Sequence, residues 1–171
     1  IAEFATAQIP VTGPFWGNLY DNFSDLLAQV TKDTSVMLLM IVIFAPLFEE
    51  IVFRGIVMKG LINKGLKPIY AIWISAIIFG AIHGNPWQFV GATFLGYVLG
   101  LVYYRTKSLL MPILLHAFNN AISSYLLVKG ETESFADFFG ISEYLVLAIG
   151  LVIFGVFYYL FTQKYKVHHL D

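Results

Sequence analysis

Six residues combine acid–base or hydrogen-bonding chemistry with strongly apolar stretches of sequence: Glu49, Glu50, Arg54, His83, His116 and Asn120. Charged groups in such stretches are costly to insert into a membrane, and they persist where they face a helix-bundle interior and carry function. Their types supply a carboxylate base, histidines and hydrogen-bond donors, which are the groups needed to hydrolyse a carbonyl compound. We therefore take these residues as the candidate functional site.

The two adjacent glutamates are expected to have different roles. Neighbouring helix residues point about 100° apart, so Glu49 and Glu50 cannot face the same partner. Glu50 and Arg54 are four residues apart, the spacing of an ion pair on one helix face. Glu49 is then the carboxylate that can act as a general base on a water shared with His83. Pro46 lacks an N–H and is expected to disturb the helix where the carboxylates lie.

His116 and Asn120 repeat the four-residue spacing on a later apolar stretch and could donate hydrogen bonds to an oxyanion. A base, a water and two such donors describe a hydrolase without a covalent nucleophile. A structural interpretation stays open beside this one. Glu50 and Arg54 could simply stabilise a helix, and His116 and Asn120 could hydrogen-bond neighbouring helices.

The elements that position these residues are expected to be membrane helices, which need about 20 mostly apolar residues each. Five stretches qualify or nearly do: residues 35–58, 68–83, 87–104, 109–128 and 144–161. With a rise of about 1.5 Å per residue, the polar groups all fall near the middle of the bilayer. Gly91, Gly96 and Gly100 favour close helix–helix contact. The predicted fold class is an all-α, polytopic transmembrane helical bundle with about five spans.

Three regions of the chain are predicted. Residues 1–34 form an N-terminal arm that contains a short interfacial helix over 19–30. Residues 35–128 form the catalytic membrane core, and residues 129–171 form an outer loop, the last span and a cytoplasmic tail. Because the chain starts at Ile1 and its arm lacks the order of a signal peptide, we expect it to be a piece of a longer protein.

The composition agrees with a membrane protein and excludes several other classes. Of the 171 residues, 58% are hydrophobic and only 12% are charged, about half the charged share of soluble domains. The net charge of −1 provides no basic surface for a nucleic acid. The absence of cysteine excludes disulfides and a thiol nucleophile. The partners expected from the composition are therefore membrane lipids and not a nucleic acid.

The basic residues predict the orientation of the spans. If the first span leaves the membrane on the cytoplasmic side, Lys32 and Lys129 lie outside and Arg54 lies within a span. The other basic residues then face the cytoplasm, and these are Lys59, Lys64, Lys67, Arg105, Lys107, Lys164 and Lys166. The C-terminus is therefore expected in the cytoplasm.

Three motifs give the sequence a family resemblance. Residues 49–54 fit EExxxR, residues 79–83 fit FxxxH and residues 116–120 fit HxxxN. In this order on successive hydrophobic stretches, they resemble the CAAX protease and bacteriocin-processing (CPBP or Abi) family of intramembrane peptidases. That family includes the type II CAAX prenyl endopeptidase. The resemblance covers about residues 35–128 and shows no departure at the motif positions.

The resemblance implies an all-helical intramembrane endopeptidase in a prokaryotic plasma membrane. Its substrate would be a peptide or a membrane-associated protein, lipidated proteins included. By motif position, Glu49 and His83 would hold and activate the water, while His116 and Asn120 would stabilise the oxyanion. The remaining motif residues, Glu50 and Arg54, would have supporting roles.

Two other classes of function are kept open. A catalytically idle member could act as a membrane scaffold or regulator, such as a bacteriocin self-immunity protein. A proton- or ion-coupled transporter also uses buried carboxylates and histidines, but the sequence shows no inverted repeat of the kind common in such folds.

No cofactor is expected. The sequence has no HExxH motif, which would place two zinc-binding histidines one turn apart, and asparagine is a poor zinc ligand. If the protein does bind a metal, zinc on Glu49, His83 and His116 is the expected arrangement.

Overall fold

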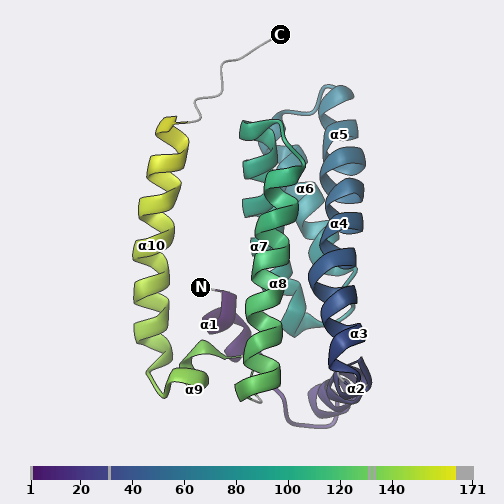
Figure 1. Cartoon of the computed structure of the whole chain (residues 1–171), viewed down its shortest axis with the longest axis vertical. Helices are drawn as coiled ribbons and strands as arrows, with labels where there is room; N and C mark the ends of the chain where they lie inside the picture. The colour runs from purple at the N-terminus through teal and green to yellow at the C-terminus, as the bar shows by residue number, and fades with distance from the viewer. Residues whose placement is uncertain (1, 31, 131, 133, 165–171) are drawn as a thin grey trace.

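The structure is a computed structural model that describes residues 2–30, 32–130, 132 and 134–164, and every regular element within these residues is a helix (Figure 1). This confirms the predicted all-α fold. Two elements, η1 and η2, are π-helical. In chain order the elements are α1 (Ala2–Ala7), α2 (Trp16–Val30), α3 (Thr34–Leu38), η1 (Leu39–Phe44), α4 (Ala45–Glu50), η2 (Ile51–Met58), α5 (Lys59–Asn63), α6 (Pro68–Ala81), α7 (Pro86–Thr106), α8 (Leu110–Gly130), α9 (Phe135–Phe139) and α10 (Glu143–Lys164).

Polar and proline residues define where these helices begin. The Asp33 carboxylate accepts hydrogen bonds from the N–H groups of Ser35 (3.0 Å) and Val36 (3.1 Å) ahead of α3. The Asn85 side chain accepts from the Gln88 N–H at 2.8 Å, and Pro86 is the first residue of α7. Such caps satisfy N–H groups that lack a partner in the first helical turn.

Each of the five predicted spans is a helix, but they differ in length. Three helical runs are long and apolar enough to cross a membrane: Thr34–Asn63, Leu110–Gly130 and Glu143–Lys164. α6 is apolar but has only 14 residues, or about 21 Å, against a hydrocarbon core of about 30 Å. The chain is therefore a membrane helical bundle in which α6 is shorter than the other predicted spans.

α6 and α7 form a closely packed helix pair at the centre of the bundle (Figure 1). A Cβ atom added at Gly96 would lie 3.1 Å from both Ala76 Cα and Phe79 Cδ1. One added at Gly100 would lie 3.1 Å from Ile72 Cγ2. The close contact predicted at these two glycines is confirmed, and it brings the FxxxH segment against α7.

The N-terminal arm covers the beginning of α7 with aromatic rings. The rings of Trp16, Tyr20 and Phe23 lie 6.4, 5.2 and 6.2 Å from the Trp87 ring, which is 7% exposed. The helix predicted over 19–30 is confirmed as α2, although it starts at Trp16 because the Gly17 N–H already donates to the carbonyl of Gly13 in the preceding turn, at 2.8 Å. Its interfacial position stays a prediction.

Candidate active site

The residues of the EExxxR motif lie on a helix with two irregular segments. The run Thr34–Asn63 is continuous, and η1 and η2 stand on either side of α4, which ends at Glu50. The N–H of Ala45 donates to Met40 O, five residues earlier, and Pro46 has no N–H to donate. The disturbance predicted at Pro46 therefore takes the form of a π-helical turn, a feature often found at functional sites.

Glu50 and Arg54 form the predicted ion pair. Arg54 Nη1 donates to Glu50 Oε1 at 2.8 Å, and both side chains are completely buried. Arg54 Nη2 donates to Gly96 O on α7 at 2.8 Å, and the guanidinium carbon lies 5.0 Å from the centre of the Phe79 ring. The pair thus joins the first span to α6 and α7. A buried pair of this kind is costly to disrupt, because removing one partner leaves the other charge uncompensated.

His116 on α8 lies between the two glutamates. Its Nδ1 is 2.9 Å from Glu50 Oε1, and its Nε2 is 3.7 Å from Glu49 Oε2. Because the carboxylate oxygen accepts, Nδ1 carries a proton and Nε2 is the nitrogen directed at Glu49. The Glu49 side chain is 27% exposed, whereas that of Glu50 is fully buried. The structure therefore confirms that Glu49 is the more accessible carboxylate.

His83 lies in the turn after α6 and reaches this group through Phe79. Its Nδ1–H donates to Phe79 O at 2.9 Å, which leaves Nε2 as the nitrogen that can accept from a water. The Phe79 ring contacts the His83 ring at 5.2 Å and the His116 ring at 5.6 Å, both edge-on. Electrostatically, Glu49 interacts with both histidines. A water shared by Glu49 and His83 stays a prediction.

Asn120 lies one turn beyond His116 on α8 and is held by the backbone of η1. Its Nδ2 donates to Ile41 O at 2.9 Å, and its Oδ1 accepts from Asn119 Nδ2 at 3.3 Å. One of the two amide N–H groups is thus used between helices, as the structural interpretation allowed. The other N–H is the one that could reach an oxyanion, and this role stays a prediction.

The structure brings Glu49, Glu50, Arg54 and His116 into one connected group, with His83 attached through Phe79. It does not gather the set named for zinc: within the described ranges, no group of three or more His, Asp or Glu side chains could hold a metal ion. Zinc binding by Glu49, His83 and His116 stays a prediction.

Three contributors to the site were missed by reasoning from the sequence. The ring of Phe79 is 1% exposed and contacts Arg54 and both histidines; its only signal was its place in FxxxH. Ser75 Oγ donates to Phe53 O in η2 at 2.9 Å, and nothing in the sequence indicated this contact. Gly96 was noted for packing, but not as the acceptor for Arg54.

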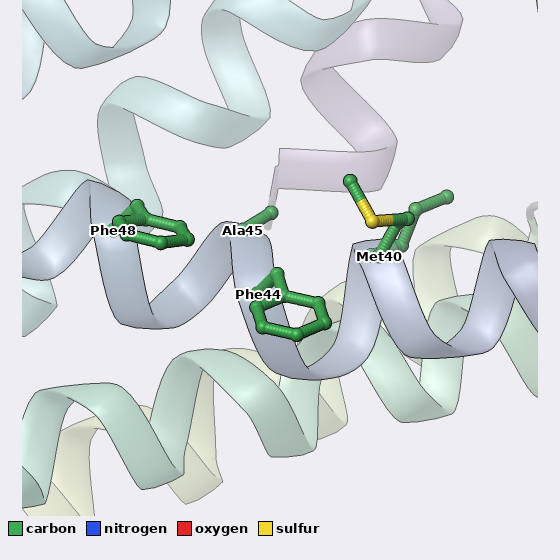
Figure 2. A pocket seen from close by; sticks show the side chains of 5 residues that line it. Met40, Phe44, Ala45 and Phe48 are labelled. Carbon is green, nitrogen blue, oxygen red and sulfur yellow. The ribbon is translucent and has the colours of Figure 1, made fainter.

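An apolar groove of about 490 Å³ lies along the first span, just ahead of the glutamates. Figure 2 shows the side chains of Met40, Phe44, Ala45 and Phe48 around it, with Ile41 completing the lining. The Phe44 and Phe48 rings are stacked 6.3 Å apart. Since no polar side chain lines the groove, it contributes no group to the chemistry of the site.

Comparison with known proteins identifies the family of this chain. A family model described as "Type II CAAX prenyl endopeptidase Rce1-like" matches residues 31–122, which include all three motifs. A Bacillus subtilis (strain 168) protein named "Putative membrane peptidase YdiL" is 31% identical over 94 residues, or 55% of this chain and 38% of that protein. The chain thus spans well under half of the length of this relative. No solved structure matches the chain. By its motifs, its helical membrane core and the match to more than half of its length, the chain belongs to the Rce1-like family of type II CAAX prenyl endopeptidases.

Proposed function

We propose that this protein is an intramembrane endopeptidase that hydrolyses a peptide bond in a peptide or a membrane-associated protein, lipidated proteins included. The observation that carries the proposal is the unequal placement of the adjacent glutamates. Glu50 Oε1 is occupied by Arg54 and His116, whereas Glu49 is partly exposed beside His116 and is not paired with an arginine. A carboxylate in that position inside a bundle is suited to act as a general base.

In the proposed reaction, Glu49 removes a proton from a water as the water oxygen attacks the peptide carbonyl carbon. His83 orients this water through Nε2, because its Nδ1 is used by Phe79 O. The resulting oxyanion accepts hydrogen bonds from His116 Nε2–H and from the second N–H of Asn120. The C–N bond then breaks, Glu49 returns the proton to the leaving nitrogen, and the products are a carboxylic acid and an amine.

Glu50 and Arg54 support this reaction by controlling His116. For His116 to donate from Nε2 while Nδ1–H donates to Glu50, its ring must carry both protons. The Glu50 carboxylate accepts the Nδ1–H of His116, and Arg54 fixes that carboxylate in place. The chemistry then uses only side chains of this chain, so we propose that no metal takes part.

We further propose that the protein lies in a prokaryotic plasma membrane with its C-terminus in the cytoplasm. The asymmetry of the lysines supports this orientation, and the chain has no cysteine, so single cysteines can be introduced as labels. A membrane-impermeant maleimide applied to intact cells is expected to label Lys129→Cys, and to label Lys107→Cys only after permeabilisation. The reverse pattern would invert the proposed topology.

The proposed activity is tested by replacing Glu49 with the isosteric Gln. Wild type, Glu49→Gln and the control Glu143→Gln, which makes the same change at an exposed position beginning α10, are expressed at matched levels in the native host. The N- and C-terminal peptides of membrane and secreted fractions are then compared by mass spectrometry. Termini that are present with wild type and Glu143→Gln, and reduced about 10²-fold or more with Glu49→Gln, are expected.

These termini would also identify the substrate. Identical termini in all three strains, together with a phenotype that every variant rescues, would contradict the peptidase proposal. That result would favour the scaffold or regulator, for which the charge of Glu49 is unimportant.

A further inference from the structure

The carbonyl of Ile41 is the point at which two helices of the site meet. In an α-helix this oxygen would accept from the N–H of residue 45, and in a π-helix from that of residue 46. The Ala45 N–H donates instead to Met40 O, and residue 46 is a proline. Both helical donors are thus missing, and Asn120 Nδ2 on α8 donates to Ile41 O at 2.9 Å.

We propose that Pro46 is a positioning residue for Asn120. Because Pro46 has no N–H, it leaves the Ile41 carbonyl available to fix the Asn120 amide, and thereby the face of α8 that also carries His116. An unsatisfied backbone carbonyl is costly in a membrane bundle, so this oxygen holds its side-chain partner firmly. This inference rests on the proposed function for its catalytic meaning, but the bond itself can be tested without a substrate.

The bond to Ile41 O also fixes the direction of the second N–H group of the Asn120 side-chain amide. That bond uses the first N–H and sets the plane of the group, so the second N–H has a single direction. His116 is one helical turn away on α8, with its ring between the glutamates. Pro46 is three residues before Glu49 on the first span. A single backbone irregularity therefore sets the position of the proposed oxyanion donors relative to the proposed base.

A double-mutant cycle on the full chain in detergent tests this link. Asn120→Ala alone leaves Ile41 O without a donor and is expected to lower the thermal midpoint. Pro46→Ala supplies an N–H at residue 46, and this N–H can donate to the carbonyl of Ile41 in place of Asn120. In the Pro46→Ala background, the drop caused by Asn120→Ala is therefore expected to be at most half as large.

The matched control is Pro112→Ala. Pro112 is also buried in an apolar helix, but it lies in the first turn of α8, where an N–H has no helical acceptor. The midpoint drop caused by Asn120→Ala is expected to be unchanged in this background. Equal drops in the Pro46→Ala, Pro112→Ala and wild-type backgrounds would overturn the proposal.

Hydrogen exchange measured by NMR on the wild type tests the proposal even if Pro46→Ala does not fold. In asparagine-selectively ¹⁵N-labelled wild type, the Asn120 side-chain amide is expected to exchange with deuterium about ten-fold or more slowly than that of Asn119, which is exposed. In folded Pro46→Ala this difference should disappear. Equal exchange of the two amides in the wild type would overturn the proposal.

Activity separates this inference from the proposed function. Once a substrate is known, Pro46→Ala is expected to lower kcat about ten-fold with little change in KM, because misplacement affects the reaction more than binding. If Glu49→Gln cleaves normally while Pro46 and Asn120 remain coupled in stability, only the peptidase proposal fails. If Glu49→Gln abolishes cleavage but the two residues are uncoupled, only the positioning role fails.

Discussion

Two helical runs of this protein have the same mean hydropathy but differ in how much of their surface is buried against the rest of the protein. The first run, Thr34–Asn63, and α10, Glu143–Lys164, both reach 2.4. In the most apolar window of the first run 22% of residues are buried within the protein, whereas in α10 none are. α10 stands at the edge of the bundle (Figure 1) and contacts α7 through the rings of Phe94 and Phe154.

The difference shows that hydropathy measures compatibility with lipid and not the number of protein neighbours. The first run carries Glu50 and Arg54, whose burial is tolerated because α7 and α8 supply partners for both. The sequence of α10 has no charged residue between Glu143 and Lys164, so it requires no such partners. The polar residues, rather than the apolar ones, distinguish the span that packs against other helices from the span that does not.

The comparison predicts the largest effect at Glu50. Glu50→Ala would leave the Arg54 guanidinium buried without its carboxylate and is expected to destabilise the fold by about 3–5 kcal/mol. The thermal midpoint and the yield of folded protein in detergent measure this loss. Glu143→Ala, at the exposed start of α10, should change neither. Similar yields and midpoints for both variants would show that the Glu50–Arg54 ion pair does not stabilise the fold.

A pair of phenylalanines gives a contrast in stability of similar size. Phe79→Ala removes a ring that is 1% exposed and contacts Arg54 and two histidines, so a loss of about 3–5 kcal/mol is expected. Phe157→Ala in α10 removes a ring that is 69% exposed, and its effect should stay below about 0.5 kcal/mol. Denaturant titration of both variants measures the difference. Equal losses would mean that α10 is buried against another surface.

Substitution of glycines is expected to have the smallest effect on stability. Gly96→Ala places a methyl group 3.1 Å from Ala76 Cα, and separating α6 from α7 is expected to cost about 1–3 kcal/mol. Gly155→Ala in α10 meets nothing within 4 Å and should be neutral or slightly stabilising, because alanine favours a helix. The two midpoints are compared in the same detergent. A neutral Gly96→Ala would show that α6 and α7 can separate without cost.

Much of the fold and part of the site followed from local sequence. The apolar stretches became helices at the predicted positions, and the four-residue spacing of Glu50 and Arg54 gave the ion pair that the structure contains. α2 began three residues earlier than predicted, since turn geometry before a helix is poorly visible in composition. The contacts of Phe79 and Ser75 could not be predicted, because each joins residues on different helices.

By itself, the sequence determined the class of the protein, the helices and the chemical types of the candidate site, because these depend on composition and on spacing within one helix. Only the tertiary structure decided that His116 bridges Glu49 and Glu50 and that Asn120 is bonded to Ile41 O. Those contacts link residues 66 to 79 positions apart. They depend on the rotation and depth of one helix relative to another, which no pattern within a single helix specifies.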